Sequence, residues 1–512
     1  MDNIPLEKYL KDAFGYDAFR EQQKEAIESI VYKRRDVVCI MPTGGGKSIC
    51  YQLPPIVMKQ PAVIISPLLS LMEDQRVGLE KNGIKACCYN STIANKARAN
   101  EDILKGVYSH IYITPETVLN CENLLKMLNI NLGISVIAID ESHCVSLWGN
   151  TFRSSYLKLA CLKQWLPDVP VLALTATATP PVETDIITLL KLNNPLRIRI
   201  SSNRPNLSYY VHIKKDPLTD LKAQVGTESS IIYCQTRDST ENIANVLTEN
   251  GVKCSAYHAG LSDGVRTKIH HEFLEDKITC IVATISFGMG IDKPDIRKVI
   301  HYGCPKDIES YFQETGRAGR DGKPSTCLIY YAPTDFATNR YFLKDIFDDK
   351  LRQYKEHMIY AMEKYLYITD CRRKYLLNYF GEVAPTQPVC CDNCSNTVKR
   401  KEANIGSAAK MFLELVAAFS GKFGKAMFIK TIKGENLKKI PASFKAHSHY
   451  GAGKMYTENA WKMCVQHLIN SDLLTEKAVR GGYGATLHIS PKGLEWLKVN
   501  EENPVFMIEV NS

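Results

Sequence analysis

Three consecutive glycines followed by a lysine and a serine stand at positions 44 to 48, directly after the apolar run Val37–Ile40. Glycines allow backbone N–H groups to curl around phosphate oxygens, and the dipole of a following helix adds positive potential. In such a loop Lys47 would reach the β- and γ-phosphates, and Ser48 would hold Mg²⁺. The strict motif has glycine where this chain has Met41. The sequence therefore predicts a variant phosphate-binding loop, formed by Thr43, Gly44, Gly45, Gly46, Lys47 and Ser48.

An acidic pair, Asp140-Glu141, follows a second apolar run at Val136–Ile139. A carboxylate at the C-terminal end of a strand beside a phosphate loop can hold Mg²⁺, which is the role we expect of Asp140. Glu141 is placed to orient or deprotonate an attacking water. Such a pair can also be a plain helix cap, but its place after the glycine loop favours the functional interpretation.

Two arginines, Arg317 and Arg320, stand three residues apart in the glycine-framed segment Gln313–Gly322. Guanidinium groups stabilise the charge that develops on a transferring phosphate, so Gln313, Arg317 and Arg320 join the candidate catalytic residues. The alternative is an arginine pair in a surface turn. Because this segment lies in a second α/β region, we expect the nucleotide between two lobes that open and close.

The elements that must position these residues follow from hydrophobic patterning. Short apolar runs alternate with longer amphipathic stretches, which is typical of buried parallel strands joined by helices, and the fold class is therefore α/β. A first series spans 36–200, a second starts near Ser230, and the connector lies near Asn203–Asn206. The region 334–380 has a helical period, and the last hundred residues form a separate mixed unit.

Composition restricts the class of protein. Of 512 residues, 64 are Lys or Arg and 55 are Asp or Glu, a formal net charge of +9, and 45% are hydrophobic. No apolar run reaches the roughly 18 residues of a membrane-spanning helix, and the start lacks the pattern of a signal peptide. With 17 scattered cysteines, we expect a soluble intracellular protein with reduced thiols, nuclear in a eukaryote and otherwise cytoplasmic.

The positive charge is concentrated near the C-terminus. Residues 395–512 contain 17 Lys/Arg and 10 Asp/Glu, which leaves the rest of the chain close to neutral. Such asymmetry indicates a polyanion-binding appendage or, alternatively, a solvated basic surface.

Taken in order, the motifs resemble those of superfamily 2 helicases and, more specifically, the RecQ family of DNA helicases. The segments that carry the resemblance are Phe19-Arg20 to Gln23, Met41–Ser48, Ser66–Leu68 to Gln75, Thr114–Glu116, Asp140–His143, Thr175–Thr177, His258–Gly260, Ala283-Thr284 to Pro294, and Gln313–Gly322. The resemblance implies two tandem RecA-like lobes that bind ATP and Mg²⁺. It also implies 3′-to-5′ movement on single-stranded DNA and unwinding of duplex DNA in repair, recombination or replication.

Further residue roles come from the resemblance alone. It places Tyr16, Arg20 and Gln23 on the adenine and Asp292 at the ribose side of the cleft between the lobes. The segment Val145–Arg153 is similar to the family's aromatic-rich loop, in which Trp148 and Phe152 would stack on bases and Arg153 would contact a phosphate or the Trp face. Asn150 and Thr151 depart from the family, which usually has His and Asp there. Backbone tracking of DNA is implied for Ser66–Ser70, Thr114-Pro115, Thr236-Arg237 and Ala283–Ser286.

Four cysteines, Cys371, Cys390, Cys391 and Cys394, include a C-x₂-C pair, which favours a structural tetrahedral Zn²⁺ site. The adjacent Cys390-Cys391 pair is geometrically awkward, so one of them could be a bystander. Free thiols in a helical hairpin are the alternative. The segment Cys371–Cys394 resembles the RecQ zinc subdomain.

The C-terminal unit has helical stretches at Ser407–Phe419 and Asn459–Ile469, then two alternating strands around Gly481-Gly482-Tyr483-Gly484, which predict a β-hairpin. This resembles the RecQ winged-helix domain, whose hairpin tip separates paired bases, with Tyr483 as the stacking side chain. An ordinary exposed turn is the alternative. The candidate phosphate contacts are Lys425, Lys430, Lys433, Lys438, Lys439 and Lys454.

We expect these domains: helicase lobe 1 (1–202), lobe 2 (203–336), a helical zinc-binding subdomain (337–398), a winged helix (399–500) and a tail (501–512). The leading functional hypothesis is an ATP-dependent DNA helicase acting on single-stranded and duplex DNA. The alternatives are a DEAD/DEAH-type RNA helicase and a nucleic-acid annealing or binding module with weak ATPase activity.

Overall fold

The computed structural model of the chain divides into two compact units. The first contains Met1–Pro305, Glu309–Tyr330 and Arg373–Thr386, and the second contains Lys306–Ile308, Tyr331–Arg372 and Gln387–Ser512. The structure describes residues 5–90, 93, 95–146, 153–285, 287, 293–344, 346, 348–385, 389–395, 400–436, 440–478 and 485–511.

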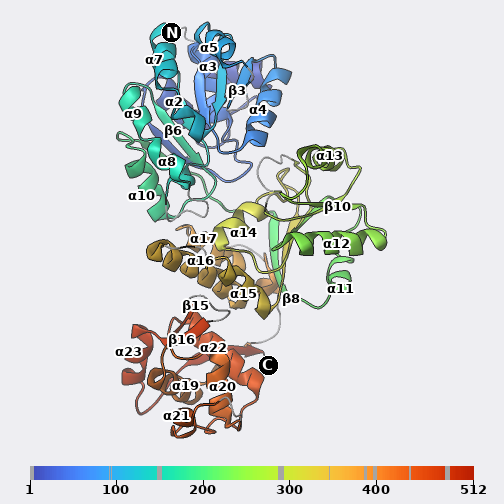
Figure 1. The fold of residues 1–512 in the computed structure, drawn as a ribbon, viewed down its shortest axis with the longest axis vertical. Coiled ribbons are helices and arrows are strands. Elements are labelled where there is room, and N and C mark those ends of the chain that lie inside the picture. The colour runs from blue at the N-terminus through green and yellow to red at the C-terminus, as the bar shows by residue number, and fades with distance from the viewer. Residues whose placement is uncertain are drawn as a thin grey trace. The chain divides into compact units, whose positions relative to one another are not determined.

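Lobe 1 of the first unit is a seven-stranded parallel sheet in the order β3-β4-β2-β5-β6-β1-β7 (Figure 1). Its strands are β1 (Val37–Ile40), β2 (Ala62–Ile65), β3 (Ala86–Tyr89), β4 (His110–Ile113), β5 (Ile137–Ile139), β6 (Val171–Thr175) and β7 (Leu196–Arg199). Val38 and Ile40 belong to one buried cluster and Val37 and Cys39 to another, so both faces of the sheet are covered. This explains why its central strands β1, β2 and β5 are apolar throughout, whereas the edge strand β7 alternates as Leu-Arg-Ile-Arg.

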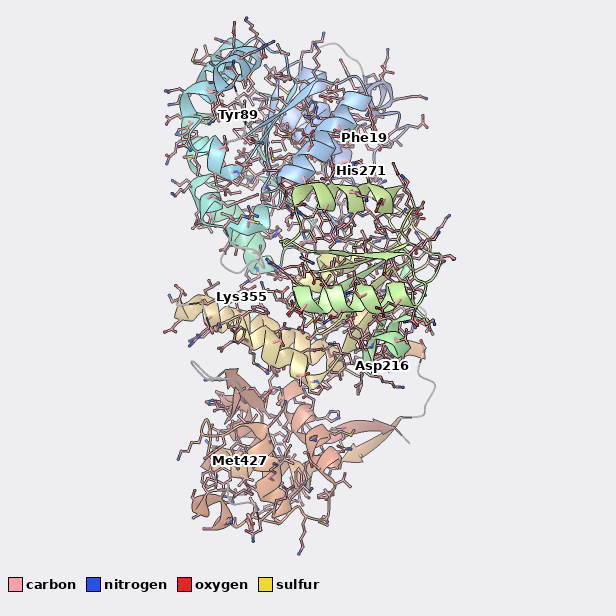
Figure 2. The ribbon with its side chains drawn as sticks, turned by 45° about the vertical axis from the view of Figure 1, so that its right-hand side comes forward. Phe19, Tyr89, Asp216, His271, Lys355 and Met427 are labelled. Carbon is pink, nitrogen blue, oxygen red and sulfur yellow. The ribbon has the colours of Figure 1, made fainter. Side chains whose placement is uncertain are left out.

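The helices of lobe 1 cover these two faces. They are α1 (Leu6–Phe14), α2 (Gln23–Val31), α3 (Ile49–Met58), α4 (Leu69–Lys81), α5 (Lys96–Leu104), α6 (Pro115–Val118), α7 (Glu122–Asn131), the 3₁₀ turn η1 (Ser142–Val145), α8 (Ser154–Lys158), α9 (Cys161–Trp165) and α10 (Pro180–Leu189). Leu6, Leu10, Ile27 and Leu53 form a cluster in which α1 and α2 pack on α3, with Phe19 against it (Figure 2).

Lobe 2 is a six-stranded sheet in the order β10-β11-β9-β12-β13-β8. Its strands are β8 (Leu207–Ile213), β9 (Ser230–Cys234), β10 (Cys254–Tyr257), β11 (Cys280–Ala283), β12 (Lys298–Tyr302) and β13 (Ser325–Tyr331). Its helices are α11 (Pro217–Leu221), α12 (Arg237–Glu249), α13 (Asp263–Leu274) and α14 (Ile308–Thr315). The predicted strands of both series and the connector between them are thus present.

The second unit combines helices with two small sheets. The helices are α15 (Pro333–Tyr341), α16 (Asp349–Tyr367), α18 (Asp392–Ser395), α19 (Gly406–Ala418), α20 (Lys425–Lys433), α21 (Ala442–Lys445), α22 (Glu458–Asn470) and α23 (Pro491–Val499), while α17 (Arg372–Tyr379) lies almost wholly in the first unit. The antiparallel pairs are β15 (Leu474–Ala478) with β16 (Ala485–Ile489) and β14 (Arg400–Asn404) with β17 (Met507–Asn511). Its hydrophobic core contains the large buried side chains of Phe412, Phe428, Phe444 and Trp461.

The end of the chain differs from the expected tail. Strand β17 pairs with β14, and Phe506 N donates to the Asn404 side chain at 2.9 Å. A Cβ on Gly406, at the start of α19, would overlap the Pro504 carbonyl, so the segment after α23 packs closely on this helix. Residues 504–511 therefore belong with helices α19 to α23 and strands β14 to β16. We call these elements together with β17 the C-terminal module. Among the residues that the structure describes, no helix combines the length and apolar character needed to cross a lipid bilayer.

We predict that Gly406→Ala lowers the free energy of unfolding of the second unit by about 1–3 kcal/mol, the usual cost of overpacking. Thermal unfolding would measure it. The control is Gly78→Ala in α4, where nothing lies within 4 Å of the added Cβ and a gain of up to about 1 kcal/mol in helix propensity is expected. Equal melting of Gly406→Ala and the wild type would mean that the terminal segment does not pack there.

Candidate nucleotide and zinc sites

The glycine loop connects β1 to α3, as its sequence predicts. Gly44 and Gly46 have φ angles of +79° and +83°, a left-handed conformation that glycine adopts at little cost. Ser48 precedes α3 and Lys47 Nζ donates to the Met41 carbonyl at 3.1 Å. The loop therefore has the backbone form that a phosphate-binding turn requires.

Arg20 and Gln23 contact this loop directly. Arg20 Nη1 donates to the Gly44 carbonyl, and Gln23 Nε2 donates to the Gly46 carbonyl at 2.9 Å. A Cβ on Gly46 would collide with the Gln23 amide, which explains why this position is glycine. Tyr16 is 54% exposed. The role of Tyr16, Arg20 and Gln23 on adenine stays a prediction, but two of the three already lie at the phosphate loop.

Lys47, Asp140 and Glu141 form a buried charged group at the ends of β1 and β5. Burial lowers the pKa of Lys47, and the charges of Glu141 and Asp140 partly offset this effect. Burial raises the pKa of Asp140 to about 7, and the charge of Glu141 adds to the rise. Burial also raises the pKa of Glu141, against the opposing charges of Lys47 and Arg317. A cation bound beside Asp140 and Glu141 would offset the negative charge of both carboxylates.

The acidic pair has neighbours in the structure that could not be predicted from the sequence. Tyr156 Oη donates to the Asp140 carbonyl at 2.9 Å, and His143 Nδ1 lies 2.9 Å from Thr175 Oγ1. Glu141 itself has φ +48°, a left-handed conformation that is strained for a side chain of this kind. Its buried Oε2 lies 3.3 Å from His143 Nδ1 and makes no hydrogen bond within the described residues. Backbone strain of this kind is typical of a functional position.

The arginine segment of lobe 2 lies against the phosphate loop of lobe 1. Arg320 packs beside Gly44, where a Cβ would stand 3.6 Å from Arg320 Cγ, and a Cβ on Gly316 would stand 3.5 Å from Thr43 Cβ. Arg317 is 5% exposed, and its buried Nε has no hydrogen-bond partner within the described part of the chain. Gln313, on α14, is half-buried. The structure thus brings together the two predicted halves of the site.

Of the four segments predicted to track the DNA backbone, three lie at helix starts, while the described residues of Ala283–Ser286 lie at the end of strand β11. Ser66–Ser70 runs into α4, Thr114 caps α6 through Thr117 N at 3.3 Å, and Thr236 caps α12 through Ser239 N at 3.2 Å. Arg153 Nη1 donates to the Pro67 carbonyl at 3.2 Å, which joins the end of the predicted aromatic-rich loop to the first of these segments. Their contact with DNA stays a prediction. The predicted DNA contacts that lie outside the described residues are Trp148, Phe152, Ser286, Lys438, Lys439 and Tyr483. Asp292, predicted at the ribose, and the departures Asn150 and Thr151 also lie outside them.

The four predicted zinc ligands converge in the second unit. The sulfur atoms of Cys371, Cys390, Cys391 and Cys394 all lie within 4.8 Å of one another. The Cys371–Cys390 and Cys391–Cys394 Sγ distances are both 3.4 Å. Four cysteine sulfurs at this spacing fit a closed tetrahedral Zn²⁺ site, and both Cys390 and Cys391 lie close enough to be ligands.

Polar contacts hold the two segments that carry the cysteines. Burial and the neighbouring thiols raise the pKa of Cys394 to about 11, so without a cation the thiol stays protonated at neutral pH. Arg372 pairs with Asp392 at 2.5 Å, and Asn393 Nδ2 donates to the Ile368 and Asp370 carbonyls at 2.8 Å. These bonds fix the backbone on both sides of the cluster.

Two of the predicted phosphate-contacting lysines have carboxylate partners. Lys425 Nζ lies 3.4 Å from Glu476, and Lys433 Nζ lies 3.5 Å from Glu435. The strands of the predicted hairpin are β15 and β16, and the Gly481–Gly484 tip lies outside the described residues. The role of these lysines and of the hairpin in DNA binding stays a prediction.

Family comparisons agree with this organisation. Residues 20–185 match the DEAD/DEAH box helicase model, 214–322 the helicase conserved C-terminal domain, 333–396 the RecQ zinc-binding model and 399–511 the RQC domain.

The chain is 41% identical over 96% of its length to an Acanthamoeba polyphaga mimivirus protein named as an ATP-dependent RNA helicase, R290, of which it covers 92%. It is 38% identical over 95% of its length to the ATP-dependent DNA helicase RecQ of Bacillus subtilis, of which it covers 82%. The solved structure of Mycobacterium smegmatis helicase Lhr bound to ssDNA and AMP-PNP shares the fold, with a TM-score of 0.54 at 18% identity, over 97% of this chain and 61% of that one.

We predict that Glu141→Gln lowers the kcat for ATP hydrolysis by on the order of 10²–10⁴-fold, because the amide cannot accept a proton from water. ATP binding should persist, since the change is isosteric. Phosphate release and nucleotide-binding assays would measure both. The control is the exposed Glu249→Gln on α12, expected to match the wild type. Undiminished turnover in Glu141→Gln would remove this residue from the chemistry.

For the cysteine cluster we predict about one equivalent of zinc in freshly purified protein and less than about half an equivalent in Cys394→Ser. Metal analysis by mass spectrometry measures both. Cys161→Ser, a half-buried cysteine outside the cluster, should keep its zinc. A wild-type protein with less than about half an equivalent would count against the site.

Proposed function

The chain belongs to the RecQ family of helicases, and from that premise we propose that it is an ATP-dependent DNA helicase. It would hydrolyse ATP to move 3′ to 5′ on single-stranded DNA and to separate duplex DNA, in repair, recombination or replication. The observation that carries this proposal is the meeting of the glycine loop and the buried acidic pair of lobe 1 with Arg317 and Arg320 of lobe 2.

In this proposal each residue of the site has one task. Lys47 binds the β- and γ-phosphates, Glu141 orients the attacking water and accepts its proton, and Arg317 and Arg320 stabilise the charge that develops on the γ-phosphate. Gln313 contributes from the preceding helix, and Tyr16, Arg20 and Gln23 hold the base. Gln313 and the two arginines come from lobe 2, so hydrolysis would require closed lobes, and the lobes would open again when its products leave.

Ser48 and Asp140 are the residues that would hold Mg²⁺. The raised pKa of Asp140, about 7 without a cation, is what a buried carboxylate shows when its compensating charge is missing. When bound, Mg²⁺ would supply charge neutralisation of the phosphates.

DNA rather than RNA is proposed as the substrate because the last third of the chain matches the RecQ zinc-binding and RQC models. In the proposed arrangement the cysteine cluster holds a structural zinc, the C-terminal module binds duplex DNA, and the loop containing Trp148 and Phe152 couples strand binding to hydrolysis. The domain limits proposed for these parts are 1–202, 203–336, 337–398 and 399 to the end of strand β17.

The test is strand displacement on 3′-tailed DNA, 5′-tailed DNA and a matched 3′-tailed RNA, with ATP hydrolysis measured in parallel. We predict displacement of the 3′-tailed DNA alone and its loss in Lys47→Ala, because that lysine is the loop's contact to the phosphates. The control is Lys81→Ala, an exposed lysine at the end of α4. Turnover restricted to RNA, as the name of the mimivirus relative suggests, would overturn the DNA assignment. Displacement that survives Lys47→Ala would remove the mechanism.

A further inference from the structure

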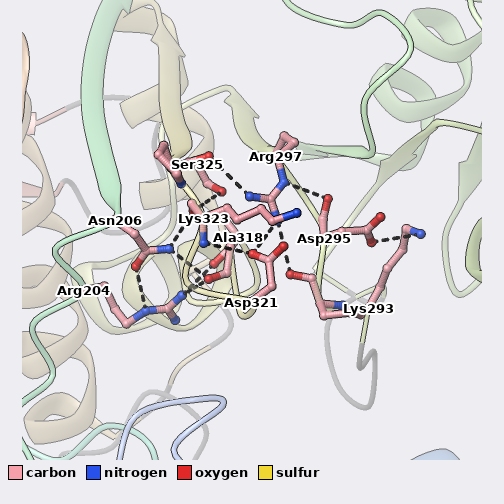
Figure 3. Close-up of polar contacts among 12 residues, drawn as sticks. Arg204, Asn206, Lys293, Asp295, Arg297, Ala318, Asp321, Lys323 and Ser325 are labelled. Carbon is pink, nitrogen blue, oxygen red and sulfur yellow. Dashed lines mark hydrogen bonds and ion pairs between the residues drawn. The ribbon is translucent and has the colours of Figure 1, made fainter.

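The segment that joins the two lobes contacts the arginine loop directly. This linker, residues 200–206, runs from the end of β7 to the start of β8. The arginine loop is residues 316–322, which contain Arg317 and Arg320. Arg204 Nη2 donates to the Ala318 carbonyl at 2.9 Å and the Gly319 carbonyl at 2.7 Å, and its Nη1 donates to the Gly316 carbonyl at 3.4 Å (Figure 3). One guanidinium therefore binds three carbonyls of the loop.

Asn206 completes this contact. Its Nδ2 donates to the Gly319 and Lys323 carbonyls, both at 2.9 Å, and its Oδ1 accepts from Arg204 Nε at 3.3 Å. Gly319 has φ +54°, and a Cβ there would stand 2.5 Å from Asn206 Nδ2. Glycine at this position is thus explained by the approach of the linker and not only by the turn.

The opposite side of the arginine loop rests on the body of lobe 2. Arg297 pairs with Asp321 at 2.7 Å, Asp321 accepts from Lys323 N at 3.1 Å, and Gly319 N donates to the Ile296 carbonyl at 2.8 Å. The loop is consequently held between lobe 2 on one side and the linker on the other.

The linker is also fixed at its lobe 1 end. The Glu382 carboxylate accepts from Ser202 N at 3.0 and 2.9 Å and from Ser201 Oγ at 2.9 Å. Arg199, just before the linker, pairs with Glu183 of α10 at 2.7 Å. With both ends bonded, the linker can transmit its own conformation to the arginine loop.

Arg204 differs from the two arginines that it supports. Its donors are committed to backbone carbonyls and to Asn206, so it does not reach for phosphate, whereas Arg317 Nε is buried without a partner in the described chain. Hydrogen bonds from a charged guanidinium to a carbonyl are stronger than those between two neutral groups. The guanidinium is also planar, so it can bind several acceptors in one plane. These are the properties of a group that fixes a loop.

We propose that Arg204 is a positioning residue, which holds the arginine loop so that Arg317 and Arg320 face the phosphates, and through which the linker between the lobes sets the rate of hydrolysis. This proposal rests on the proposed function, since it requires ATP hydrolysis with arginines in the transition state. A misplacement of about 1 Å can cost on the order of 10²-fold in rate. Loss of Arg204 should therefore lower kcat strongly and leave ATP binding nearly intact.

The experiment compares Arg204→Ala, Arg204→Lys and the exposed control Arg197→Ala on strand β7, in the full chain with single-stranded DNA. For Arg204→Ala we expect kcat at least about tenfold lower with KM for ATP within about threefold, and intermediate values for Arg204→Lys, which keeps one charged donor. Affinity for ADP with aluminium fluoride should fall while affinity for AMP-PNP is kept, because only the former mimics the transition state.

Non-additivity separates positioning from general loss of structure. In a chain that already carries Arg317→Ala and Arg320→Ala, adding Arg204→Ala should change the residual turnover less than about twofold, since the groups that it positions are gone. A similar further loss in that background would overturn the proposal, as would wild-type kcat in Arg204→Ala or Arg204→Lys. If Arg204→Ala does not fold, Arg204→Lys carries the test, both alone and added to the double-arginine background. A wild-type chain without DNA-stimulated hydrolysis would instead refute the proposed function.

Discussion

The structure depends on the mutual compensation of buried charges at the meeting of two sheets. Asp140 on lobe 1 is a buried carboxylate, and Glu141 and Lys47 beside it are half-buried. Burying unpaired ions is costly, so each of these groups requires the others and the charge of Arg317 from lobe 2. The charge of Arg317 acts on Glu141 from the other lobe, so both lobes contribute to the electrostatics of the site.

Parallel strands explain how such distant residues meet. The glycine loop follows β1 and the acidic pair follows β5, and strands of one parallel sheet end at the same edge. The lobe 1 sheet is buried on both faces, so its position is fixed by apolar packing that does not involve the charged groups. The cost of strain at Glu141, with its positive φ angle, is therefore carried by a scaffold stable enough to hold it.

A structural feature could be predicted from the sequence when it depends on residues that lie close together in the chain. Ala62–Ile65 was predictable to the residue because a buried parallel strand is a continuous apolar run. Strand β17 was missed because a short edge strand with the sequence Met-Ile-Glu-Val-Asn is defined by its partner β14, which lies far away in the chain. The contacts of Arg204 were invisible for the same reason, since they go to backbone carbonyls more than a hundred residues away, where side-chain identity leaves no pattern.

The second unit shows a similar limit for charge counting. The positive excess of residues 395–512 predicted a surface for polyanions, yet Lys425 of this region pairs with Glu476, which Arg340 also approaches, and Arg340 in turn binds Glu363 at 2.7 Å. Burial raises the pKa of Glu363 to about 7. These pairs tie α15 and α16 to β15, so part of the basic charge stabilises the module itself. The sequence supplies the total charge, and only the structure divides it between internal pairs and the surface.

The central claim is that one chain closes its own two lobes to complete the site. It is tested most directly by mixing two inactive variants, Lys47→Ala and Arg317→Ala, and measuring DNA-stimulated ATP hydrolysis over a range of protein concentrations. The account predicts no recovery, because each chain lacks one half of its own site. Recovery that grows with concentration, toward a substantial fraction of the wild-type rate, would mean that lobes of different chains form the site and would contradict it.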